Sequence, residues 1–256
     1  MKHPALLLAA LVAVALETLP ALSQEPAPEP PRNIQFELQA VTLPEPLAME
    51  LIPDLLDAKK IEAANTRLQK LLLDGKAQLA GWLILTTKSG QRAVVESVEE
   101  VRYATEFDPG QVAITVQMPN ADAAQGDTIK VSPKIQADGI DPVPKSFETR
   151  NTGVTLEIDP MLAPDGETVD MYILPQHVRL LRWASVTIKH GDSGKEVTVE
   201  QPVFSSLRVT TSLTLKSGQR KLIGNFKITD PPGSMELFIL RVEVQHLPAA
   251  ASGTAK

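Results

Sequence analysis

From Ala77 onward, most of the chain alternates apolar and polar residues in short runs that are separated by turn-forming residues. In Gly153–Leu162, for example, Val154, Leu156 and Ile158 occupy every second position. Side chains two positions apart lie on the same face of a strand, so this pattern indicates strands with one buried face. Strands joined by tight turns pair antiparallel. The sequence therefore predicts a mainly β (α+β) protein, built as an antiparallel sheet or sandwich.

A strand–helix element precedes these strands. Asn33–Leu43 alternates apolar and polar residues, as a half-buried strand does. Pro46 suits the first turn of a short helix, which Pro53 would interrupt. From Asp54 to Asp74 apolar residues recur at helical spacing, which predicts one helix with a candidate break near Asn65. Its apolar stripe is Ile61, Ala64, Leu68, Leu71 and Leu72, and Gly75 is the expected C-terminal stop.

The pentapeptide KSGQR occurs twice, at 88–92 and at 216–220, each time between two strand-like runs. Glycine accepts the positive φ that a tight turn requires, so each copy predicts a β-hairpin. Lysine and arginine flank each turn and suit solvent. The tips, Ser89-Gly90 and Ser217-Gly218, are therefore candidate contact loops.

The first 23 residues have the pattern of a secretory signal peptide. A short basic start is followed by the apolar stretch Ala5–Leu16 and by small residues at Ala21–Ser23. An uncleaved anchor is the alternative. Residues 24–32 form a Pro-rich linker, and 248–256 a disordered tail. The chain has no cysteine, so an exported form has no disulfides. We expect it in the periplasm, or associated with the outer membrane or cell surface.

Between the signal peptide and the tail we expect three portions. Residues 33–110 form the N-terminal strand–helix–hairpin portion, 111–146 a long loop excursion and 147–247 the C-terminal β portion. Short strands are expected at Val112–Val116 and Ile129–Val131. Loops of this length are often functional, so Asp108 and Gly110, where the excursion begins, are further candidate contact residues.

No motif for catalysis, a cofactor or a metal is found. The net charge of −6 and the lack of a basic run argue against a nucleic-acid partner. The four histidines, at positions 3, 177, 190 and 246, share no metal-ligand spacing. A nucleophile elbow, a phosphate-binding loop and a paired-cysteine motif are also missing. We predict no catalytic, cofactor-binding or metal site.

One acidic group invites a different hypothesis. Five carboxylates follow the first KSGQR copy: Glu96, Glu99, Glu100, Glu106 and Asp108. Their alternation with apolar residues favours a solvated strand face. The alternative is an exported hydrolase that uses them for acid–base chemistry.

Two stretches together resemble a known family: FETRNTGVTLEIDPMLAPDGETVDMYIL, and then QPVFSSLRVTTSLTLKSGQRKLIGNF. They are similar to the C-terminal domain of the bacterial secretins, the ring-forming proteins of type II and type III secretion and of type IV pili. The earlier run LTTKSGQRAVVESVEEVRY resembles the upstream strand pair of that family, and Glu236–Gln245 its closing strand. The motif residues that match are Gly153, Val154, Leu156, Pro160, Pro202, Arg208, Thr210, Gly218 and Gly224.

The resemblance implies a secretin-like β portion in a non-enzymatic assembly component of a type IV pilus or of a type II/III secretion apparatus. It would contact envelope secretion or pilus proteins through sheet edges and loops, and would form a homo-oligomer. The family usually carries Gly-Gly where this chain has Gly224-Asn225, followed by a membrane-lip segment that Lys227–Ser234 is too short to supply. A minimal outer-membrane channel subunit is therefore the alternative rather than the preferred function.

Overall fold

The computed structural model describes residues 32–108, 112–115, 136–139, 143–190 and 195–246. The predicted signal peptide, most of the linker, Gly110, the expected strand Ile129–Val131 and the tail lie outside these residues. The strands are β1 (Arg32–Pro44), β2 (Gln78–Lys88), β3 (Ala93–Asp108), β4 (Val112–Thr115), β5 (Gln136–Gly139), β6 (Val143–Leu162), β7 (Thr168–His190), β8 (Lys195–Arg208), β9 (Thr211–Lys216), β10 (Arg220–Ile228) and β11 (Ser234–His246), and the helices are α1 (Glu45–Leu56) and α2 (Ile61–Leu73).

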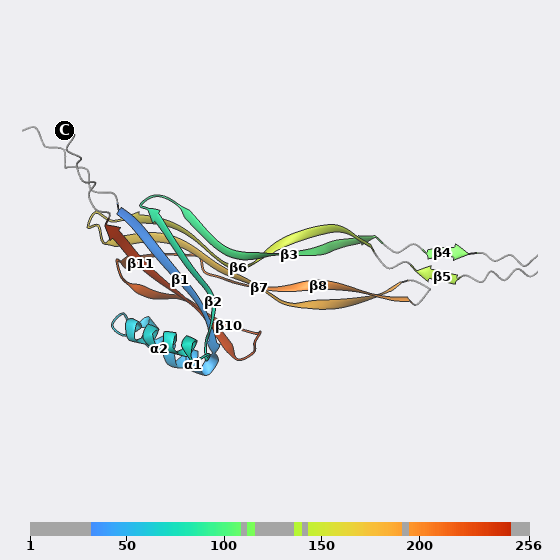
Figure 1. Ribbon diagram of the computed structural model, residues 1–256, viewed down its shortest axis with the longest axis horizontal. Helices are drawn as coiled ribbons and strands as arrows, with labels where there is room; N and C mark the ends of the chain where they lie inside the picture. Colours follow the sequence, from blue (N-terminus) through green and yellow to red (C-terminus); the bar gives the residue numbers. More distant parts are fainter. Residues whose placement is uncertain (1–31, 109–111, 116–135, 140–142, 191–194, 247–256) are drawn as a thin grey trace, which may run out of the picture. The chain divides into compact units, whose positions relative to one another are not determined.

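Two sheets carry most of these strands, and every pairing is antiparallel, which confirms the predicted fold class (Figure 1). The four-stranded sheet has the order β10-β11-β1-β2. The five-stranded sheet has the order β3-β6-β7-β8, and β9 also pairs with β7. Each sheet takes strands from both the N-terminal portion and the C-terminal β portion of the sequence. A separate pair, β4-β5, includes the expected short strand at Val112, whereas β6 already begins at Val143, inside the stretch predicted as a loop.

The central strands of the four-stranded sheet, β1 and β11, are covered on both faces. One face of β1 and β11 packs against the five-stranded sheet through residues such as Phe36 and Phe238. The other face packs against α1 and α2 through residues such as Val41 and Leu237 (Figure 1). The prediction of a half-buried first strand is therefore wrong for Leu38–Val41, where four successive residues are buried.

The helices begin and end at different places from those predicted. Pro46 lies in the first turn of α1 and Pro53 lies inside it, so the first helix is not interrupted there. The break falls at Asp57–Lys60, and Asn65 lies inside α2, which makes the single helix from Asp54 to Asp74 a wrong prediction. Asp57 causes the break: it is extended, its carboxylate accepts the Lys59 N–H at 2.8 Å, and its carbonyl accepts the N–H of Ile61.

The end of α2 is as predicted. Gly75 has φ 68°, the left-handed conformation that favours glycine after a helix. Its N–H donates to the carbonyl of Leu72, and the Lys76 N–H donates to that of Leu71. This pair of bonds is a Schellman motif, which satisfies the last carbonyls of the helix.

The predicted hairpins at the two KSGQR copies are wrong. The first copy joins β2, in the four-stranded sheet, to β3, in the five-stranded sheet. The second copy joins β9, in the five-stranded sheet, to β10, in the four-stranded sheet. A Ser-Gly turn reverses the chain in either case, and the turn sequence alone does not determine whether the next strand pairs with the previous one. Both copies are therefore crossovers between the layers of the sandwich.

Gly153 marks the point where β6 gains a second partner. β6 pairs with β3 along most of its length, but with β7 only from Gly153 to Leu162. Gly153 has φ 123°, and a Cβ atom there would lie 2.1 Å from the carbonyl oxygen of Ser97 on β3. Only glycine fits this backbone and this close approach.

We expect Gly153→Ala to lower the free energy of unfolding by about 3 kcal/mol or more. A backbone conformation that side chains rarely adopt costs about 1–3 kcal/mol, and β3 must shift as well to make room. Gly75→Ala is the matched control, because Gly75 also has a positive φ but a Cβ atom added there would meet nothing within 4 Å. Urea unfolding measures both, and equal losses would show that the contact with β3 is unimportant.

Candidate functional site

The first KSGQR crossover is bonded to the sheet that it enters. The Gly90 N–H donates to the carbonyl of Pro160 on β6 at 2.7 Å. Two residues further along β6, the Leu162 N–H donates to the Ser89 Oγ at 2.9 Å. The turn thus continues the pairing of β6 beyond the point where β3 leaves it.

The second crossover repeats these bonds on the other sheet. The Gly218 N–H donates to the carbonyl of Val242 on β11 at 2.8 Å. Two residues further along β11, the Val244 N–H donates to the Ser217 Oγ at 2.9 Å. We call the two structures the Ser-Gly latches, Ser89-Gly90 and Ser217-Gly218. In both, the groups predicted to meet a partner protein are engaged by the chain itself, although Gly90 and Gly218 remain exposed.

A turn beside the second latch is built around Asp165. Its carboxylate accepts the backbone N–H groups of Glu167 and Thr168 and the Thr168 hydroxyl. The hydrogen bonds from Thr168, followed by the one from Glu167, lower the pKa of Asp165 to about 2. The Ser217 N–H donates to the Glu167 carbonyl at 2.8 Å, so this turn and the latch support each other.

A buried pair of polar side chains joins the two sheets. The Nδ1 of His177, on β7, lies 2.6 Å from the Oε1 of Glu236, on β11. Their side chains are 8% and 0% exposed, and Thr42 donates to the second carboxylate oxygen of Glu236 at 3.4 Å. Sequence reasoning missed this pair. The alternation along each strand could have indicated it. Glu236 lies two positions from the inward-facing Phe238, and His177 lies four positions from the inward-facing Ile173, so each shares the inward face of its strand.

The acidic residues after the first latch do not converge. Glu96, Glu99 and Glu100 are exposed on β3, and neighbouring Glu99 and Glu100 point to opposite faces of the strand. Glu106 accepts a hydrogen bond from Ser146 at 2.7 Å, and Asp108 lies where β3 ends, opposite Val143. In the described ranges no three His, Asp or Glu side chains are close enough to hold a metal ion.

The other motif residues have structural positions. Val154 and Leu156 are core residues between the sheets, and Gly224 lies at the irregularity where β10 changes register against β11. On β8, Pro202 lies opposite Trp183, and Arg208 donates to Gln176 at 3.2 Å. Thr210 is exposed between β8 and β9.

The five-stranded sheet ends in two long edge strands, β3 and β8. In the described part of the chain, β3 pairs with β6 alone and β8 pairs with β7 alone. The two are linked at Phe204 of β8, which lies 5.8 Å from the ring of Tyr103 and 4.8 Å from the guanidinium of Arg150. Desolvation and the hydrogen bond to Glu148 raise the pKa of Tyr103. These strands are the candidate interaction surface.

No protein-family model matches the sequence, and no curated protein matches it either. Solved structures similar to this chain are secretin domains. The InvG secretin domain of the Salmonella SPI-1 injectisome is 9% identical, with a TM-score of 0.40, and the match covers 88% of this chain and 66% of that one. The secretin PilQ of the V. cholerae type IV competence pilus is 11% identical, with a TM-score of 0.37, covering 85% and 62%.

The type II secretin GspD of E. coli K12 is 11% identical, with a TM-score of 0.33, and the match covers 84% of this chain and 50% of that one. The chain thus spans two thirds or less of these structures. Identities and TM-scores this low assign no activity and no residue role to the chain. The helices in its described part are too short or too polar to cross a membrane.

We expect Ser217→Ala to cost about 1–3 kcal/mol of stability, because the partly buried Val244 N–H then loses its acceptor. Ser89→Ala should cost less, since its bond to Leu162 is exposed. Ser212→Ala, an exposed position on β9, is the control. Urea unfolding gives the energies, and amide hydrogen exchange should quicken at Val244. Unchanged exchange there would contradict the latch.

His177→Leu or Glu236→Leu alone should cost about 3–5 kcal/mol, because each leaves a buried polar group without its partner. The double variant should cost less than the two losses together, with a coupling of about 0.5–3 kcal/mol. Thr42→Val, which removes only the longer hydrogen bond, serves as the control. Urea unfolding of the four proteins closes this double-mutant cycle, and additive losses would show that the pair does not act as a unit.

Proposed function

We propose that this chain is a non-enzymatic assembly component of a cell-envelope secretion or pilus apparatus, and that its copies associate through β3 and β8. The observation that carries the proposal is the pair of long edge strands that come first and last in the order of one sheet, with 16 residues in β3 and 14 in β8. The two edges touch each other at Tyr103 and Phe204, where Gln201 of β8 also donates to the Ala104 carbonyl of β3 at 3.0 Å. An edge strand presents unpaired backbone N–H and C=O groups, to which another strand can add.

Two different edges favour a head-to-tail arrangement. If β8 of one copy pairs with β3 of the next, each copy uses one edge and offers the other. Such heterologous contacts form a ring where the rotation between copies closes, and a filament where it does not. The five-stranded sheet would then continue from copy to copy, which leaves neither edge open to unwanted pairing.

The charges on the strands support this arrangement. β3 carries five acidic residues and a single basic residue, Arg102. The β8 edge itself carries two basic and two acidic residues, and the adjacent β7 carries three basic residues and one acidic residue, Asp170, so this side of the sheet is positive overall. Opposite potentials at the two ends of a sheet steer unlike ends together and keep like ends apart. Envelope proteins of the same apparatus are the proposed partners, in the periplasm or at the outer membrane.

Neighbouring proline variants in β3 test the proposal. Along an antiparallel strand, successive residues direct their N–H groups to opposite sides. Of Glu99→Pro and Glu100→Pro, one therefore removes a bond to β6, and the other removes only a donor at the free edge. Both positions are exposed glutamates, so the two variants differ mainly in the side of β3 that loses an N–H donor.

We expect the edge-facing variant to keep its circular dichroism spectrum and melting temperature and to lose the oligomer in size-exclusion chromatography with light scattering. The other variant should be less stable. A wild-type protein that stays monomeric at high concentration would contradict the proposal. So would an edge-facing variant that still assembles.

A further inference from the structure

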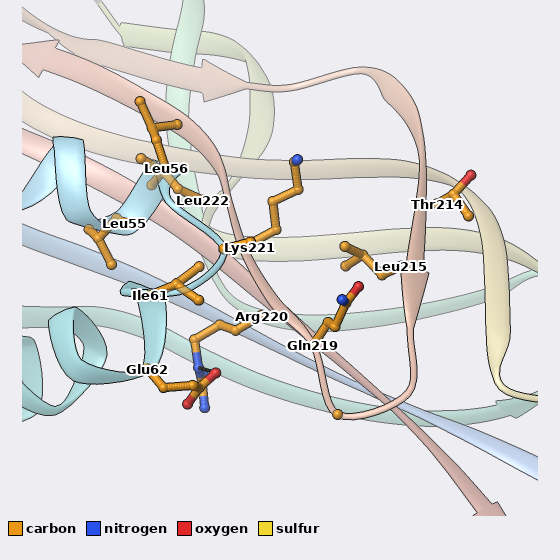
Figure 2. Close-up of a pocket in the computed structure, with 12 residues that line it drawn as sticks. Leu55, Leu56, Ile61, Glu62, Thr214, Leu215, Gln219, Arg220, Lys221 and Leu222 are labelled. Atoms are coloured by element: carbon orange, nitrogen blue, oxygen red, sulfur yellow. Dashed lines mark ion pairs between the residues drawn. The ribbon is translucent and has the colours of Figure 1, made fainter.

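A cavity of about 310 Å³ lies where the connection between α1 and α2 meets the second Ser-Gly latch (Figure 2). Its apolar walls include Ile61 and Leu215, and Leu56 stands at its side with 67% of its surface exposed. Arg220, the last residue of the second KSGQR copy, also lines it. The volume is at the small end of the range of about 300–1,000 Å³ that is usual for ligand pockets.

The guanidinium of Arg220 is buried and forms an ion pair with Glu62, but two of its nitrogens have no hydrogen-bond acceptor in the described part of the chain. Its side chain is 9% exposed, and its Nε and Nη1 donate to no acceptor among the described residues. The nearest carboxylate, that of Glu62, lies 3.6 Å from Nε, too far for a hydrogen bond, and the Glu62 side chain is 65% exposed (Figure 2). An arginine cannot lose its proton to avoid the cost of burial, and Glu62 balances its charge without accepting a hydrogen bond, so a further acceptor beside the unbonded nitrogens would be favourable.

The fold holds Arg220 in this position. The preceding residue, Gln219, accepts the Val242 N–H through its carbonyl and the Lys216 N–H through its side chain. Across the sheet, Arg241 is opposite Arg220 and is paired with Glu243 at 2.8 Å, so that carboxylate already has a cation. The guanidinium is therefore fixed beside the cavity.

The nearby helix end adds to the positive potential. α2 begins at Ile61, at the cavity wall, and its N-cap residue, Lys60, makes no side-chain capping bond. The first N–H groups of a helix carry partial positive charge, which favours an anion close to them. The cavity therefore combines a buried cation, a helix N-terminus whose first turn carries Glu62, and apolar walls.

We infer that this cavity binds the C-terminal carboxylate of a partner polypeptide whose last residue is apolar. A guanidinium pairs with a carboxylate through two parallel hydrogen bonds, and such a pair would satisfy one of the two unbonded Arg220 nitrogens together with Nη2. In a C-terminal residue the carboxylate and the apolar side chain branch from the same Cα, so one residue can reach both features of so small a space. The site is separate from the β3 and β8 edges and does not depend on their association.

The test uses N-acetyl-leucine as the probe and N-acetyl-leucinamide, which lacks the charge, as its control. In heteronuclear NMR titrations of the purified protein, N-acetyl-leucine should saturably shift the resonances of Leu56, Leu215 and Arg220. The amide should bind at least tenfold more weakly. An amidated Leu-Asp dipeptide tests whether an internal acidic side chain is the true ligand.

Two variants complete the test. Arg220→Met should weaken binding of N-acetyl-leucine at least tenfold and leave the melting temperature unchanged or higher, because it removes a buried charge whose partner, Glu62, is 65% exposed and stays hydrated when left alone. Lys227→Gln, on the same strand but outside the cavity lining, should change binding less than twofold.

Equal binding of N-acetyl-leucine and its amide would overturn the inference, as would tighter binding of the Leu-Asp amide. A marked loss of melting temperature in Arg220→Met would also overturn it, because the guanidinium would then serve the fold itself.

Discussion

The pairing of β1 with β11 is the interaction on which the rest of the described structure depends. These strands lie between the helices and the five-stranded sheet, and from Ser234 to Leu240 every residue of β11 is buried. Backbone groups in such a layer have no water to bond, so only neighbouring strands can satisfy them. Side chains in this layer are shielded from water as well. Glu236 is tolerated there because His177 contacts one oxygen of its carboxylate and Thr42 contacts the other.

The Ser-Gly latches solve one geometric problem twice. Where the chain crosses from one sheet to the other, the neighbouring strand extends beyond its pairing partner, and its next backbone groups need another source of hydrogen bonds. A glycine with positive φ turns the chain and donates its N–H to a carbonyl of that neighbouring strand. The Oγ of the preceding serine accepts the N–H that lies two residues further along the same strand. The recurrence of KSGQR is therefore explained by two equivalent corners. It requires neither a duplicated domain nor two exposed binding loops.

Much of this fold could be predicted from local patterns, since alternation reports which residues face inward whatever the strand pairs with. The strands after Ala77 and the stop at Gly75 follow from such patterns. Pairing could not be predicted, because a Ser-Gly turn suits a crossover as well as a hairpin. The helix break was missed because the Asp57 side chain competes with the helix for backbone donors, an effect that apolar spacing does not report.

The candidate site was harder to predict than the fold. The acidic residues of β3 were recognised as a solvated face, but an edge strand is defined by the neighbours that it lacks, and the sequence does not contain that information. Arg220 looked like a solvent-exposed flank of a turn. It is buried because the second latch directs the chain into a sheet whose far face is covered by α1 and α2.

The central place of β11 also governs how the chain can fold. The four-stranded sheet joins the first described strand to the last one, so its core cannot close until nearly the whole chain is available. Loop closure over such a distance must precede most of the stabilising contacts, which makes folding slow and leaves apolar strands exposed in the meantime. A β1–β2 pair that forms early has no cover on either face. Only when β11 pairs with β1 does β1 become a central, buried strand.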